Sequence, residues 1–209
     1  METVLGKTEK FGRTLMHEHL TINLSKEKDD ADANLSDDEA MIEDLKALKA
    51  AGIDTICDVT NVGMGRDVGR MAMIAEKSGV NVLPSTGFYK DPYFPEIVYK
   101  STEKELATFI MKEIVEGIDG SGIRAAIIGE IGTSRDGFAD GEKKVFLAAA
   151  RAHAETGAPI TTHTTLGKYG LEQVELLKSS GVDMERLVIG HLDLNPDMDY
   201  YLRILEKGC

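Results

Sequence analysis

Short apolar runs alternate with amphipathic segments along this chain of 209 residues, and that alternation restricts the folds open to it. The runs are brief and apolar on both faces, as buried parallel strands are. The segments between them carry helix start and stop signals, so the sequence predicts six successive βα units. The predicted strands are 14–19, 53–60, 80–86, 124–131, 158–163 and 187–191.

Capping signals place the intervening helices. Ser36 is expected to begin one helix, because Glu39 follows it by three residues as in a capping box, and Gly52 ends it. Thr102 and Glu105 repeat this spacing at the start of a helix over 102–117. Further helices are expected over 141–156, 169–180 and about 196–207.

Repeated βα units without a linker predict one α/β domain over 1–209, built as a TIM-type (β/α)8 barrel. Six units are two fewer than eight, and closed barrels of this type usually need about 250 residues. We therefore expect a sequence that is truncated after the sixth βα unit.

Composition excludes several other classes. The net charge of -12, from 24 basic and 36 acidic residues, disfavours nucleic-acid binding, which depends on phosphate neutralisation. No run approaches the roughly 18 apolar residues of a membrane span, and the first residues lack the apolar core of a secretion signal. We expect a cytoplasmic protein that binds neither membranes nor nucleic acid. Cys57 lies inside an apolar run and is expected in the core.

Four of the five histidines stand at the end of a predicted strand. His17 and His19, in TLMHEHL, are two residues apart, so both side chains point to one face of a strand. His163 and His191 end later runs, and the carboxyl ends of barrel strands meet on one rim. The four imidazoles are therefore candidate metal ligands, with satisfied core histidines as the alternative. His153 lies within a predicted helix and is expected to be structural.

Glu130 follows an apolar run in AAIIGEIG, where an unpaired buried carboxylate would cost several kcal/mol. Coordination removes that cost, and two carboxylate oxygens can bridge two cations. Two metals about 3.5–4 Å apart can share a hydroxide that attacks a substrate. The alternative is a protonated or arginine-paired glutamate in the core.

Six segments occur along the chain in this order: GRTLMHEHL, TNVGMGRD, STGFYKDPYFP, GEIGTS, THT and GHLD. Through these segments the chain resembles the phosphotriesterase family of the amidohydrolase superfamily. The resemblance is nearest to its subgroup of phosphotriesterase homology proteins, and it extends from about Gly12 to the last residue. It implies a (β/α)8 barrel with two divalent metal ions, usually zinc. By this resemblance His17 and His19 bind the more buried metal, His163 and His191 bind the more exposed metal, and Glu130 bridges them.

The resemblance also implies an activity. We expect hydrolysis of a lactone or another carboxylic ester by a metal-activated hydroxide. Many family members bridge their metals with a carboxylated lysine where this chain has Glu130, and their last ligand, an aspartate on strand eight, lies beyond this sequence. We therefore expect this exact chain to be inactive or severely impaired, and a full-length parent with that aspartate to be active.

The predicted partner is a small-molecule ester or lactone, and a homodimer is compatible with the sequence. Arg66, Tyr89 and Lys168 follow predicted strands two, three and five, where they could contact such a substrate, and a cation there could hold an anionic group.

Two other functions remain open from the sequence. A TatD-like metal-dependent nuclease also begins with HxH on its first strand, although the acidic composition counts against it. The second alternative is a non-catalytic protein that binds metal at the same residues.

Overall fold

The computed structural model describes residues 2–209, which fall into two compact units. The first unit comprises the chain through Thr86 together with Lys112–Ile127. The second unit comprises Gly87–Met111 and Ile128–Cys209. Each unit is described by itself below.

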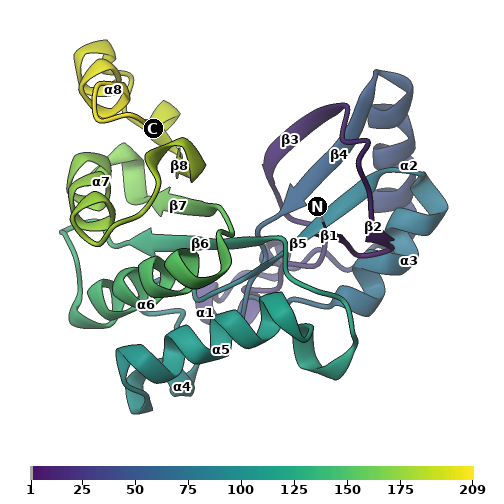
Figure 1. Ribbon diagram of the computed structural model, residues 1–209. Helices are drawn as coiled ribbons and strands as arrows, with labels where there is room; N and C mark the ends of the chain where they lie inside the picture. Colours follow the sequence, from purple (N-terminus) through teal and green to yellow (C-terminus); the bar gives the residue numbers. More distant parts are fainter. Residues whose placement is uncertain (1) are drawn as a thin grey trace. The chain divides into compact units, whose positions relative to one another are not determined.

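The first unit is built on three parallel strands in chain order (Figure 1): β3 (Arg13–Glu18), β4 (Ile53–Asp58) and β5 (Asn81–Thr86). Two-residue strands β1 (Glu2–Thr3) and β2 (Gly6–Lys7) pair antiparallel before them. The helices are α1 (Ser25–Lys28), α2 (Asp38–Ala50) and α3 (Val68–Ser78), with 3-10 turns at Ala31–Ala33 and Ile118–Gly120.

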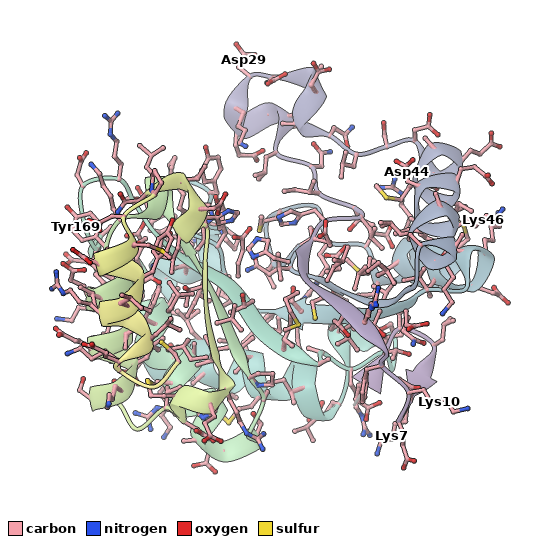
Figure 2. The ribbon with its side chains drawn as sticks, turned by 90° about the horizontal axis from the view of Figure 1, so that it is seen from above. Lys7, Lys10, Asp29, Asp44, Lys46 and Tyr169 are labelled. Carbon is pink, nitrogen blue, oxygen red and sulfur yellow. The ribbon has the colours of Figure 1, made fainter. Side chains whose placement is uncertain are left out.

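Apolar side chains of α2, α3 and the strands form the core of the first unit. Helix α2 contacts β4, and α3 contacts β5. Ile56 and Met71 are fully buried in one apolar cluster of this unit. Cys57 is also fully buried, as predicted, and burial raises the pKa of its thiol to about 12. Charged side chains such as Asp44 and Lys46 lie on the exposed face of α2 (Figure 2).

The second unit also has parallel strands in chain order: β6 (Ile127–Thr133, whose first residue belongs to the first unit), β7 (Ile160–Thr164) and β8 (Leu187–Gly190). Its helices, in chain order, are α4 (Glu96–Lys100), most of α5 (Glu103–Val115), α6 (Asp140–Thr156), α7 (Gly170–Ser179) and α8 (Met198–Leu205). Helix α6 contacts α7, and α7 contacts α8 (Figure 1). Three 3-10 turns complete this unit: η3 (Thr165–Gly167), η4 (Met184–Arg186) and η5 (Leu192–Leu194).

The predicted βα order is confirmed, with differences at element ends. Asp37, and not Ser36, is the N-cap of α2, and its carboxylate accepts a hydrogen bond of 3.0 Å from Ala40 N. The capping box of α5 is as predicted, because Thr102 N donates to Glu105 and Glu105 N donates back to Thr102 Oγ1. The strand predicted at 124–131 lies at 127–133, and the last helix is shorter than predicted.

None of the helices among residues 2–209 is long and apolar enough to cross a membrane.

His153 has the structural role that its position in a helix predicted. It is 5% exposed in α6, and its Nδ1 lies 2.8 Å from the carbonyl oxygen of Ala158. Its Nε2 accepts a hydrogen bond of 3.1 Å from Asp183 N. The ring therefore links the end of α6 to the segments that precede β7 and β8. Its Nδ1 is the donor and its Nε2 the acceptor.

Replacing His153 with alanine should lower the free energy of unfolding by about 2–4 kcal/mol, because it leaves the buried carbonyl of Ala158 without this partner and a cavity in place of a buried ring. Urea unfolding followed by circular dichroism measures this change. The exposed Glu155→Ala variant in the same helix should shift stability by less than about 0.5 kcal/mol. Equal stabilities of the two variants would contradict the structural role of His153.

Candidate metal centre

The first unit holds one pair of predicted ligands. His17 lies in β3, and His19 follows its last residue. Both are partly buried, and their ring centroids are 5.7 Å apart with an interplanar angle of 82°. The two imidazoles are neighbours at the carboxyl end of one strand, as the HxH spacing predicted.

The second unit holds the other three predicted ligands, with two imidazoles beside one carboxylate. Glu130 lies in β6 and is 2% exposed. Its Oε2 is 2.9 Å from Nδ1 of His163 in β7 and 3.4 Å from Nε2 of His191, which directly follows β8. The centroids of the two imidazole rings are 4.4 Å apart. Three side chains from three successive strands therefore direct an oxygen and two nitrogens at one point.

The buried carboxylate shifts the two histidines in opposite directions. Burial lowers the pKa of His163, although its hydrogen bond to Glu130 opposes that shift. His191 is less buried, and its hydrogen bond to Glu130 raises its pKa. Without a cation, His191 is thus the imidazole that more readily takes the charge opposite Glu130.

Two glycines explain the local sequence GEIG around the carboxylate. Gly129 has a φ of 124°, and a Cβ there would lie 2.1 Å from the carbonyl oxygen of Thr161 in β7. A Cβ at Gly132 would lie 3.2 Å from Cβ of His163 and 3.3 Å from Cβ of Lys90. The approach of β7 therefore excludes a larger residue at Gly129, and there is little space for one at Gly132.

Hydrogen bonds from side chains to the backbone hold the strand ends of the second unit. Gln173 of α7 is fully buried, and its Nε2 donates to Thr133 Oγ1 at 2.8 Å and to the carbonyl of His163 at 2.9 Å. Thr164 Oγ1 donates to the carbonyl of Gly190, the residue before His191, at 2.7 Å. These bonds fix the backbone that carries His163 and His191.

The donors present fit a divalent transition metal. Imidazole nitrogens and carboxylate oxygens are ligands of zinc and of related cations. Glu130 is 2% exposed, and the burial of its charge is costly. A cation bound between this carboxylate and the two imidazoles would offset that cost.

Tyr89 lies beside these ligands. Its hydroxyl is 3.1 Å from Nε2 of His163, and it is 8% exposed. Burial, with the nearby charge of Glu130, raises the pKa of Tyr89, so the hydroxyl keeps its proton. Lys168 follows the 3-10 turn after β7 and is exposed at the surface of the second unit.

Arg66 has a different role from the one that we expected. Its side chain is 4% exposed, and its two terminal nitrogens lie 2.7 and 2.6 Å from the oxygens of Glu113 in α5. It also donates to the carbonyl of Ser85 at 3.0 Å, while Thr86 Oγ1 donates to Glu113. The guanidinium is thus engaged in a buried ion pair that ties α5 to β5.

Lys90 is a cation that the sequence analysis missed. Its Nζ lies 5.4 Å from the ring centroid of Tyr89 and 5.0 Å from that of Tyr93. Its Cβ and that of His163 border the same glycine, Gly132. The only sequence signal was its position after Tyr89 in STGFYKDPYFP.

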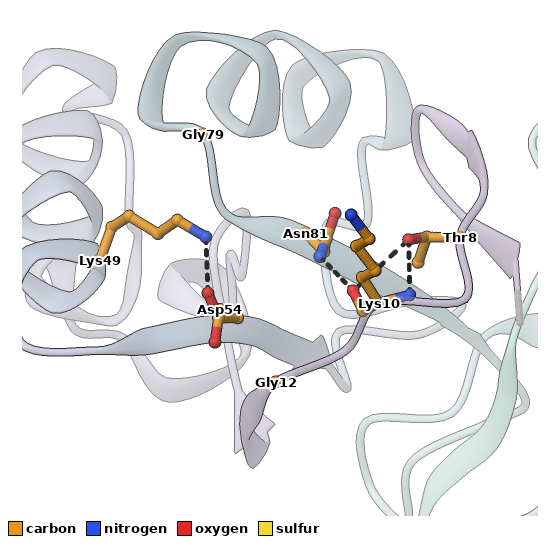
Figure 3. Close-up of a pocket in the computed structure, with 7 residues that line it drawn as sticks. All are labelled: Thr8, Lys10, Gly12, Lys49, Asp54, Gly79 and Asn81. Carbon is orange, nitrogen blue, oxygen red and sulfur yellow. Dashed lines mark hydrogen bonds and ion pairs between the residues drawn. The ribbon is translucent and has the colours of Figure 1, made fainter.

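A pocket of about 490 Å³ lies at the other end of the first unit's strands (Figure 3). It is bordered by Gly12, Asp54 and Asn81, which stand where β3, β4 and β5 begin. Lys49 donates to Asp54 across it at 2.8 Å, and this bond lowers the pKa of Asp54. The pocket is therefore separate from His17 and His19 at the carboxyl end of β3.

Comparison with known proteins gives a consistent family. A model described as the Phosphotriesterase family matches residues 1–209. The phosphotriesterase homology protein of Escherichia coli strain K12 is 42% identical over 198 residues, which are 95% of this chain and 68% of that protein. The N-acetyltaurine hydrolase of Homo sapiens is 30% identical, and the match covers 100% of this chain and 69% of that protein.

Solved structures agree. A crystal structure of the Escherichia coli phosphotriesterase homology protein, with phosphate in its active site, matches at 40% identity with a TM-score of 0.94. That match covers 97% of this chain and 70% of the other. A lactonase from Listeria monocytogenes matches at 31% identity and a TM-score of 0.93, over 100% and 70% of the two chains. These matches confirm the predicted barrel class.

The buried pair of Arg66 and Glu113 generates a stability prediction. Glu113→Gln should lower the free energy of unfolding by about 3–5 kcal/mol, because it leaves the Arg66 charge buried without its carboxylate. Thermal and urea unfolding measure this loss. The control variant, Glu103→Gln, lies in the same helix as Glu113. It breaks a more exposed ion pair, with Arg151 of α6, and should cost less than about 1 kcal/mol. A Glu113→Gln variant as stable as this control would contradict the structural role.

Proposed function

Because the chain belongs to the Phosphotriesterase family, we propose that it is a hydrolase that works with two divalent cations, with zinc as the expected metal. The observation that carries this proposal is the buried carboxylate of Glu130 between His163 and His191. A carboxylate in that position requires positive charge, and the two imidazole nitrogens are directed where a cation would supply it.

In this proposal His17 and His19 hold one cation, His163 and His191 hold the other, and Glu130 bridges the two. The support is chemical and topological. All five donors are nitrogens or oxygens. The four histidines lie in the last part of a parallel strand or just after one, and Glu130 lies in the middle of β6. The carboxyl ends of such strands carry the active sites of α/β barrels.

Bound cations would supply Lewis acidity, which polarises a carbonyl group and lowers the pKa of water. The protein's own residues have distinct tasks. Glu130 holds negative charge at a fixed point away from solvent. The hydroxyl of Tyr89 stays protonated beside His163, and it can therefore donate a hydrogen bond to the carbonyl oxygen of a substrate.

The proposed substrate is a lactone or another carboxylic ester. The lactonase from Listeria monocytogenes, which has the same fold, supports this choice. A second candidate substrate is an amide that carries an acidic group. The human relative is named for N-acetyltaurine, which is an amide with a sulfonate. Lys90 beside His163 favours an anionic substituent in either case. The exposed Lys168 is proposed as an outer contact.

The nuclease alternative finds no support in these relatives, whose names include a lactonase and an N-acetyltaurine hydrolase. A protein that binds metal without turnover is the remaining alternative, and the substrate experiment below separates it from an enzyme.

Metal content tests the centre directly. The purified chain, loaded with zinc and dialysed, should retain about two metal ions per molecule by elemental analysis. Glu130→Gln should lose most of them, because the amide supplies less negative charge to two cations. Glu142→Gln removes another fully buried carboxylate of the second unit and should leave the metal content unchanged. Retention of about two metals in Glu130→Gln would contradict the bridging role.

Substrate selectivity tests the role of Lys90. Zinc-loaded protein, extended with a segment that supplies the family's strand-eight aspartate, is assayed with a neutral lactone, a lactone bearing a phosphate, and an N-acyl amino sulfonate. Lys90→Gln should raise KM for the anionic substrates about 10-fold or more and leave the neutral lactone nearly unchanged, because it removes a charged hydrogen-bond donor. Lys104→Gln removes an exposed lysine of α5 and should change neither.

Equal effects of Lys90→Gln on charged and neutral substrates would contradict anion recognition by Lys90. Metal retention with no turnover of any of the three substrates by the extended protein would contradict the hydrolase proposal and favour a binding protein.

A further inference from the structure

The ring of His19 is hydrogen-bonded to a fully buried polar residue of the first unit, which is in turn hydrogen-bonded to a second one. Its Nδ1 lies 2.9 Å from Thr60 Oγ1. Thr60 follows the end of β4 by two residues, and Asp58 is the last residue of that strand. The side chains of Thr60 and Asp58 have no exposed surface. This arrangement lies within one compact unit.

The carboxylate of Asp58 acts as an acceptor in this arrangement. Its Oδ2 accepts a hydrogen bond of 2.7 Å from Leu20 N, and its Oδ1 accepts one of 2.8 Å from Thr60 N. The Thr60 side chain also hydrogen-bonds to it. Three donors from two segments therefore converge on Asp58. Burial raises the pKa of this carboxyl, and the hydrogen bonds that it accepts oppose that shift.

A threonine hydroxyl has a single proton, and that proton settles the direction of the remaining bond. If the hydroxyl donates to Asp58, its oxygen can only accept from His19. Nδ1 of His19 must then carry the ring proton. Nε2 becomes the nitrogen with the lone pair, which is the form of imidazole that binds a cation.

We propose that Thr60 and Asp58 are positioning residues that hold His19 as the Nδ1-protonated tautomer, so that Nε2 is the atom presented to the metal. This inference rests on the proposed function, because it gives His19 a metal to bind. It names the coordinating atom of His19 and two residues outside the predicted ligand set on which metal affinity depends.

The tautomer of His19 can be measured without any metal. Long-range proton–nitrogen correlation spectra of the nitrogen-15-labelled, metal-free chain distinguish a protonated ring nitrogen from one with a lone pair. The His19 signals are assigned by their loss in His19→Gln. At a pH well above the imidazole range, we expect a protonated Nδ1 and an Nε2 with a lone pair.

Variants then test the dependence on Thr60. Thr60→Val removes the hydroxyl with little change in shape, and should give a mixture of His19 tautomers and weaken zinc binding about 10- to 100-fold in chelator competition. Thr60→Ser keeps the hydroxyl and should behave like the natural protein. Thr55→Val makes the same change at a fully buried threonine within β4 and should leave the tautomer and zinc affinity unchanged.

A protonated Nε2 in the natural chain would overturn the inference, whatever the variants do. An unchanged tautomer and unchanged zinc affinity in Thr60→Val would also overturn it. If the natural chain shows the expected tautomer but binds no zinc, the proposed metal function fails while the hydrogen-bond arrangement stands. The two failures are therefore distinguishable.

Discussion

The burial of one carboxylate constrains everything around it. Glu130 is 2% exposed in the second unit, and its Oε2 lies 2.9 Å from Nδ1 of His163 and 3.4 Å from Nε2 of His191. A buried charge costs several kcal/mol unless opposite charge compensates it. The close strand approach at Gly129 and the bond from Gln173 to the backbone of His163 keep that carboxylate against its partners. The fold thus maintains an arrangement that is unfavourable without positive charge at its centre.

The two units orient their histidines by different means. In the first unit a hydroxyl and a buried carboxylate stand behind the ring of His19. In the second unit the ring nitrogens face Glu130, while hydrogen bonds from Gln173 and Thr164 hold the backbone near His163 and His191. Ring orientation and backbone position both limit where a nitrogen can lie, and metal binding needs both to be correct.

Local patterns predicted what depends on local chemistry. The alternation of apolar runs and capped helices predicted the strands. Strand ends led to the four candidate histidines, whereas Glu130, predicted near the end of its strand, lies in the middle of β6. The role of Arg66 could not be read locally, because its partner Glu113 is 47 residues away. Lys90 was missed for a related reason: its place beside His163 arises only when the segment after β5 borders Gly132 of β6. The N-cap of α2 moved by one residue because Asp37 caps as well as Ser36 would.

In the proposed centre Glu130 links two cations held by two different pairs of histidines. X-ray diffraction from zinc-loaded crystals, with data collected on both sides of the zinc absorption edge, tests this arrangement most directly. The arrangement predicts two anomalous peaks, one beside His17 and His19 and one beside His163 and His191, with an oxygen of Glu130 in contact with each. A single peak, or two peaks with Glu130 bound to neither, would contradict it.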